Sequence, residues 1–221
     1  IYLLPNELLI YITEYLQKKS LQRLTQVSQL FREIASPRYF ECVGFKPPIH
    51  FEGLSVNHGS CKALPVWRRT NAFMVPSTLW FTASHQTLNA EFKMLDVFFA
   101  SLGEGSIRRV FLYFFSGPSN VTPSLVSLLE SIQQLGCREL YCHGFEWLWR
   151  SRHSFTIPTS TCKSRLMRLE LCSSLLFSGL AIPFTLKTLQ SAPLEKLVLT
   201  DTSLTATQWS PFLEPLYLPH L

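Results

Sequence analysis

The stretch LMRLEL at residues 166–171 places leucine at its first, fourth and sixth positions. Its last three residues alternate apolar and polar, as in a strand with one buried face. The same apolar pattern recurs at 107–112, 137–142 and 194–199, and the fourth positions of successive copies are 30, 29 and 28 residues apart. A repeat of nearly constant period predicts equivalent strands stacked side by side.

The pattern also names the residues that we expect to be buried in these strands. They are Ile107, Val110 and Leu112, then Cys137, Leu140 and Cys142, then Leu166, Leu169 and Leu171, and finally Leu194, Leu197 and Leu199. A weaker copy precedes them at Pro76, Leu79 and Phe81, 31 residues earlier by the same measure.

Apolar residues at helical spacing lie between the strands. One series runs over residues 88–102 and a second over 125–135. The second has typical helix ends, with Thr122 as N-cap, Pro123 at the first helical position and Gly136 beyond the last. The connectors around 184–189 and 209–213 are shorter and contain prolines.

A strand followed by a helix at this period resembles an irregular leucine-rich repeat over residues 76–221. The resemblance implies an α/β solenoid with parallel strands on the concave face and helices on the convex face. A compact domain with an open parallel sheet is the alternative. The next copy would open at Leu221, the last residue, so we expect the array to be truncated at its C-terminus. We assign residues 46–75 to an irregular linker or capping segment.

The first 45 residues predict three short helices. The first should cover about residues 6–17 with Asn6 as its N-cap, while Ser20 and Ser28 can cap the second and third. Pro37 should stop the third helix. Helices this short bury little surface, so they are either a helical cap on the following domain or a module that docks onto a partner.

The residues Leu4-Pro5-Asn6-Glu7-Leu8-Leu9 and Val27-Ser28, followed by Phe31-Arg32, resemble an F-box over residues 1–45, although many F-boxes have Cys and Trp at 28 and 31. The resemblance implies a substrate-recognition subunit of a Skp-cullin-F-box type E3 ubiquitin ligase, bound through a Skp-family adaptor to cullin and RING subunits. A non-ligase interaction scaffold with an F-box-like helical cap is the alternative. The positions implied in adaptor binding are Leu4, Pro5, Leu8, Leu9, Ile12, Leu21, Leu24, Val27 and Phe31.

Successive strand residues point to opposite faces, so the residues beside the buried ones should share the open face. This face should bind a protein substrate of unknown identity, unless it is an ordinary solvated sheet face. The segment 144–165 adds Trp147, Trp149, Arg150 and Arg152, either as an anchor loop or as packed aromatics. The predicted substrate-binding residues are Arg109, Phe111, Tyr113, Glu139, Tyr141, His143, Arg168, Glu170, Lys196 and Val198.

The composition argues against other classes of function. Six cysteines without a framework spacing are typical of reduced thiols in the cytoplasm or nucleus. Metal ligation by Cys137, Cys142, His143, Cys162 and Cys172 competes with core packing, which we favour. The net charge of +5 without a dense basic stripe suits an acidic partner rather than nucleic acid, and no apolar run approaches the roughly 20 residues of a membrane span. We find no catalytic or cofactor-binding motif and expect neither enzymatic activity nor a cofactor.

Overall fold

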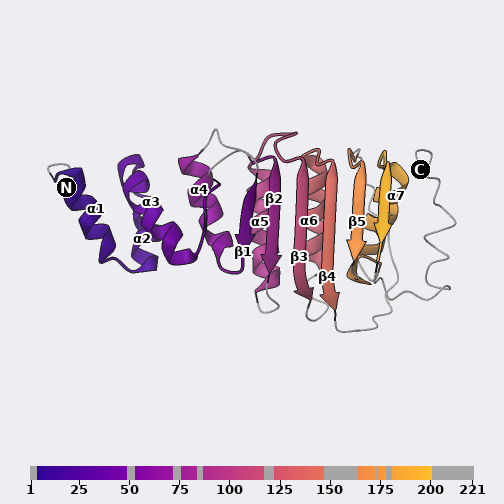
Figure 1. Ribbon diagram of the computed structural model, residues 1–221, viewed down its shortest axis with the longest axis horizontal. Helices are drawn as coiled ribbons and strands as arrows, with labels where there is room; N and C mark the ends of the chain where they lie inside the picture. The colour runs from indigo at the N-terminus through magenta and orange to yellow at the C-terminus, as the bar shows by residue number, and fades with distance from the viewer. Residues whose placement is uncertain are drawn as a thin grey trace.

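A computed structural model describes residues 4–48, 53–71, 76–83, 87–116, 122–146, 164–172, 174–177 and 181–200. The chain begins with short helices and continues into a parallel sheet covered by further helices (Figure 1). No helix within the described ranges is both long and apolar enough to cross a membrane.

The N-terminal helices are α1 (Asn6–Glu14), α2 (Lys18–Leu24) and α3 (Gln29–Val43). The Ser28 cap is confirmed, because its Oγ accepts a hydrogen bond from the Phe31 amide at 3.3 Å. The caps predicted at Asn6 and Ser20 are wrong, because both residues lie within the helices. The N-cap residues are Pro5 for α1 and Gln17 for α2, and neither of these two makes a side-chain hydrogen bond to its helix.

Pro37 does not stop α3, which continues to Val43 and ends at Gly44 with a φ of 66°. A proline inside a helix removes the hydrogen bond to the carbonyl four residues earlier, here that of Glu33. Both residues are exposed, so water can satisfy that carbonyl. Gly44 ends the helix because glycine adopts the left-handed conformation without strain.

The cap at Ser28 gives a direct test of how α3 begins. Ser28→Ala should lower the free energy of unfolding by about 1 kcal/mol, because the Phe31 amide loses its acceptor. Ser20→Ala, within α2, should change it by less than about 0.5 kcal/mol. Urea denaturation followed by circular dichroism measures both, and equal losses would contradict this assignment of the caps.

The sheet contains six parallel strands in the order of the sequence, β1-β2-β3-β4-β5-β6. Val110, Leu140, Leu169 and Leu197 are paired in register, so the predicted repeat copies are confirmed as neighbouring strands. The weaker copy is also a strand, since Leu79 pairs with Val110. The strands are β1 (Leu54–Asn57), β2 (Thr78–Ala83), β3 (Arg109–Ser116), β4 (Glu139–Glu146), β5 (Arg168–Cys172) and β6 (Lys196–Leu199).

One face of the sheet carries α5, α6 and α7, which lie behind the strands in Figure 1, whereas α4 lies between α3 and the β1 end of the sheet. The two predicted apolar series are buried and lie on α5 and α6, apart from their last members, Leu102 and Leu135, which follow the helix ends. Gly136 takes a φ of 74° after α6. The described helices after α3 are η1 (Ser60–Ala63), α4 (Leu64–Thr70), α5 (Leu88–Ala100), α6 (Thr122–Gln134), η3 (Ser174–Phe177) and α7 (Ile182–Ser191).

A repeated pair of backbone hydrogen bonds also joins neighbouring strands at the starts of β3, β4, β5 and β6. The Ser77 carbonyl accepts from the amides of residues 108 and 109, and the Arg108 carbonyl accepts from those of 138 and 139. The carbonyls of Arg138 and Met167 continue the series to residues 167 and 168 and then to 195 and 196. These four strands therefore enter the sheet with the same geometry.

The segment 46–75, assigned from the sequence to an irregular linker or cap, is regular in much of its described part. It contains β1, η1 and α4, and β1 pairs with β2 from Leu54 to Asn57. The Tyr39 hydroxyl of α3 donates to the Lys62 carbonyl at 3.2 Å, and the rings of Phe45 and Trp67 lie 6.3 Å apart. The N-terminal helices thus share a continuous core with the sheet.

Candidate functional site

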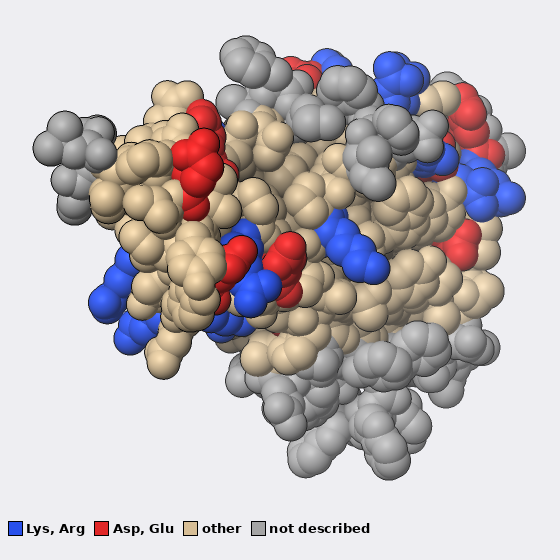
Figure 2. All heavy atoms as spheres, turned by 60° about the vertical axis from the view of Figure 1, so that its left-hand side comes forward, with Lys and Arg blue, Asp and Glu red and all other residues tan. Residues whose placement is uncertain are grey.

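Helix α1 presents a row of large apolar side chains to solvent. Leu8, Tyr11, Ile12 and Tyr15 are spaced so that they share one side of the helix, and we call this row the α1 stripe. Leu8 is 49% exposed and Tyr15 is 70% exposed. The two tyrosines hydrogen-bond through their hydroxyls at 2.6 Å. Figure 2, which brings the N-terminal side forward, shows mainly uncharged atoms there.

The residues predicted to bind an adaptor divide into three groups by their exposure to solvent. Leu9 and Leu21 are buried within the chain, so they can only support the helices. Leu24 and Phe31 are partly buried. The positions exposed enough to meet a partner are Leu4, Pro5, Leu8, Ile12 and Val27.

Sequence reasoning missed Tyr11 and Tyr15 as docking residues. Leu9 and Thr13 face inward from α1, and the spacing of 8, 11, 12 and 15 places those four side chains together on the opposite side. A helical projection centred on Leu8 would have found both tyrosines.

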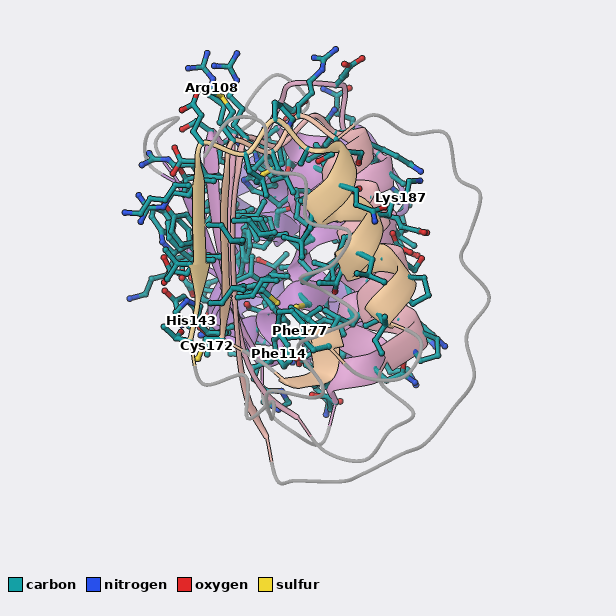
Figure 3. All side chains as sticks on the ribbon, turned by 90° about the vertical axis from the view of Figure 1, so that its right-hand side faces the viewer. Arg108, Phe114, His143, Cys172, Phe177 and Lys187 are labelled. Carbon is teal, nitrogen blue, oxygen red and sulfur yellow. The ribbon has the colours of Figure 1, made fainter. Side chains whose placement is uncertain are left out.

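The second candidate surface is the open face of the sheet, opposite the helices. Figure 3 views the sheet end-on, with Phe114 and Phe177 between the layers and His143 on the outer side of the strands. The strand register places the predicted substrate residues in rows. One row is Arg109, Glu139, Arg168 and Lys196, the next is Phe111, Tyr141, Glu170 and Val198, and the third contains Tyr113 and His143.

Three rings form a stack across this face, which we call the aromatic ladder: Trp80, Phe111 and Tyr141. Trp80 and Phe111 are 5.7 Å apart with planes at 15°, and Phe111 and Tyr141 are 4.2 Å apart at 10°. The Arg168 guanidinium lies 5.0 Å from the centroid of the Tyr141 ring. Trp80 was missed because it lies on the weaker repeat copy, where only the buried positions were assigned.

Gly53 adjoins the other end of the aromatic ladder. A Cβ at this position would lie 1.9 Å from the outer edge of the Trp80 ring. Only glycine therefore permits the observed position of Trp80 beside β1.

The carboxylates of the open face are already hydrogen-bonded. The Tyr141 hydroxyl donates to Glu139 at 2.8 Å, and burial together with this bond raises the pKa of Tyr141 to about 12, so the phenol stays protonated at neutral pH. Glu170 contacts His143 Nε2 at 3.0 Å and an Arg168 nitrogen at 3.6 Å. Both carboxylates therefore already have a hydrogen-bonding partner on this face.

Trp147, Trp149, Arg150 and Arg152 lie outside the described residues, so their suggested role as an anchor loop stays a prediction.

Comparison with known families finds a match that includes the α1 stripe. Residues 1–40 match the F-box-like family model. The F-box-like domain therefore includes α1, α2 and most of α3, and with them the whole α1 stripe. A domain of this kind binds Skp-family adaptors. No curated protein and no solved structure matches the chain.

The buried cysteines are part of the core. Cys137 and Cys142 occupy strand-repeat positions, and Cys61 is buried within η1. Burial raises the pKa of both Cys61 and Cys137 to about 12. Cys142 and His143 are consecutive in β4 and point to opposite faces, which separates two of the suggested metal ligands. Cys162 lies outside the described residues.

Alkylation by iodoacetamide at pH 8 should distinguish these thiols. A pKa near 12 leaves only about one thiol in ten thousand ionised at this pH, and the thiolate is the reactive form. Cys61 and Cys137 should stay unlabelled in the folded chain and react after unfolding in urea, whereas exposed Cys42 should react at once. Peptide mass spectrometry reads each site separately, and rapid native labelling of Cys137 would contradict its burial.

Proposed function

We propose that this chain is the substrate-recognition subunit of a Skp-cullin-F-box type ubiquitin ligase. Its F-box-like domain binds a Skp-family adaptor, which links it to cullin and RING subunits, and its sheet holds the protein substrate. The observation that carries the proposal is the α1 stripe within residues 1–40. Large apolar side chains are exposed to water there, and the free energy falls when a partner covers them.

We further propose that residues 76–221 form a leucine-rich-repeat solenoid, continuous with β1. Three features support this: the sequential strand order, the helices on one face, and the backbone pair repeated at Ser77, Arg108, Arg138 and Met167. In a solenoid each unit packs mainly on its neighbours, which accounts for the uniform geometry at the starts of β3 to β6.

In this proposal the chain is not an enzyme and carries no cofactor. It increases the rate of ubiquitin transfer by holding the substrate close to the charged conjugating enzyme. Such ligases act where thiols are kept reduced, and the free cysteines of the described residues suit the cytoplasm or nucleus.

Adaptor binding is tested by placing charge on the α1 stripe. Leu8→Asp with Ile12→Asp should weaken capture of a Skp-family adaptor at least about tenfold, because both carboxylates would be buried without a partner. Val97→Asp, at an exposed aliphatic residue of α5, is the matched control and should leave capture unchanged. Surface plasmon resonance with purified adaptor measures both. Equal capture by all variants, with unchanged circular dichroism, would refute docking through α1.

An interaction scaffold without ubiquitin transfer is the second candidate, and one contact favours it. Tyr39 and Phe45 join the F-box-like domain to Lys62 and Trp67, so the helices also close the β1 end of the sheet as a cap would. This contact uses α3 and leaves the α1 stripe exposed, so capping and docking are compatible.

Reconstitution of the full ligase separates the two candidates. The chain, assembled with adaptor, cullin, RING subunit and conjugating enzyme, should ubiquitylate proteins captured from a cell extract. Arg168→Glu with Glu170→Arg should abolish modification of those proteins while adaptor binding persists. Capture without any ubiquitin transfer would leave the scaffold as the function.

A further inference from the structure

We infer that the open face binds an acidic segment of the substrate polypeptide, one that carries carboxylates beside a large apolar side chain. This inference rests on the proposed function and specifies the class of substrate for the same surface. Three properties carry it: the orientation of the aromatic ladder, the pairing of the carboxylates, and the exposure of the cations around them.

The aromatic ladder offers ring edges to an incoming group. Because the planes of Trp80, Phe111 and Tyr141 are nearly parallel and each ring stacks on the next, the inner faces are covered. Gly53 closes in on the Trp80 end, and Arg168 lies over Tyr141 at the other. The edge of an aromatic ring carries partial positive charge, whereas its face is negative. Edges therefore favour carboxylate oxygens and aliphatic contact over a cation.

The charged residues around the aromatic ladder also favour a negatively charged partner. The described residues of the three rows include three cations and two carboxylates. The cations are Arg109, Arg168 and Lys196, and the carboxylates are those of Glu139 and Glu170. Glu139 accepts a hydrogen bond from Tyr141, and Glu170 contacts both His143 and Arg168. The side chains of Arg109 and Lys196 are exposed. An acidic partner gains these cations without having to displace a free carboxylate.

Arg168 contributes a further unsatisfied group. Its Nε is buried and makes no hydrogen bond within the described part of the chain. Leaving a buried donor unpaired costs roughly 1–3 kcal/mol. A substrate carboxylate approaching beside Tyr141 would supply an acceptor once the Arg168 side chain turned to expose this nitrogen.

A nucleic acid is the rival polyanion, and the same geometry disfavours it. Unstacked bases bind proteins by stacking on free aromatic faces, which the aromatic ladder does not leave open. Phosphate binding also depends on many cations along a track, whereas the described cations of the open face are few. The rows suit a short acidic stretch with an apolar residue between its carboxylates.

Peptide display tests this chemistry directly, because it requires no identified substrate. The probe is a random peptide library, panned on the full chain bound to its Skp-family adaptor. We expect the selected peptides to be enriched in Asp and Glu beside Phe, Leu or Trp and depleted in Lys and Arg. Their binding should weaken as salt concentration rises.

Two charge-matched double variants locate the binding surface. Arg109→Glu with Lys196→Glu should weaken the selected peptides at least tenfold. Lys62→Glu with Lys93→Glu, at exposed lysines of η1 and α5, should leave them unchanged. Phe111→Ala should also weaken binding, because the apolar contact is lost with the stack.

The outcomes separate this inference from the proposed function. Selection of basic or uncharged peptides, no enrichment at all, or equal loss in both double variants would overturn the acidic-segment inference while adaptor capture stayed intact. Binding of a single-stranded RNA oligonucleotide in place of peptides, dependent on Arg109 and Lys196, would overturn it in favour of nucleic acid. Failure of adaptor capture would instead overturn the proposed function.

Discussion

The constraint on which the rest of the structure depends is the parallel register of the strands. Leu79, Val110, Leu140, Leu169 and Leu197 are aligned. The inward residues of β1 to β5 are buried in the core, and those of β6, Leu197 and Leu199, are partly buried against it. Because side chains alternate, aligning the buried leucines also aligns the residues between them. A shift of one residue in any strand would turn its buried residues outward and break the aromatic ladder. The core and the open face are therefore fixed by the same pairing.

The C-terminal part of α3 holds the F-box-like domain against the sheet. Tyr39, Phe40 and Val43 are buried toward Phe45 and Trp67, so α3 supplies the contact with the sheet domain. Helix α1 needs only its inward-facing side to pack within the chain. Its outer side can therefore hold residues that folding does not require. Apolar residues at such positions cost solubility and give no stability to the chain alone, which is why they point to a partner.

The repeated strands were predictable because each copy is long and its apolar spacing recurs. The same reasoning missed β1, a strand of four residues in which only Leu54 and Val56 face inward. Pro37 was misjudged because a local rule excludes proline from helices, whereas burial of the residues after it carries α3 onward. Alternation also predicted which residues share the open face. The stacking of their rings depends on how neighbouring strands are aligned, and the sequence of one strand does not give that alignment. The contact of Gly53 with Trp80 was missed for the same reason.

The continuous core bears on how the two surfaces work together. A flexible linker between a docking module and a substrate-binding sheet would let the substrate sample a wide volume, and the effective concentration at the conjugating enzyme would fall accordingly. Here the contacts run without a break from Tyr39 through Phe45 and Trp67 to Phe98 of α5. The α1 stripe and the aromatic ladder thus belong to one packed body, with the N-terminal helices beyond the β1 end of the sheet (Figure 1). A substrate held on the ladder would keep a fixed distance from the adaptor, so rigidity of the junction between α3 and α4 becomes part of the proposed function and not only of stability.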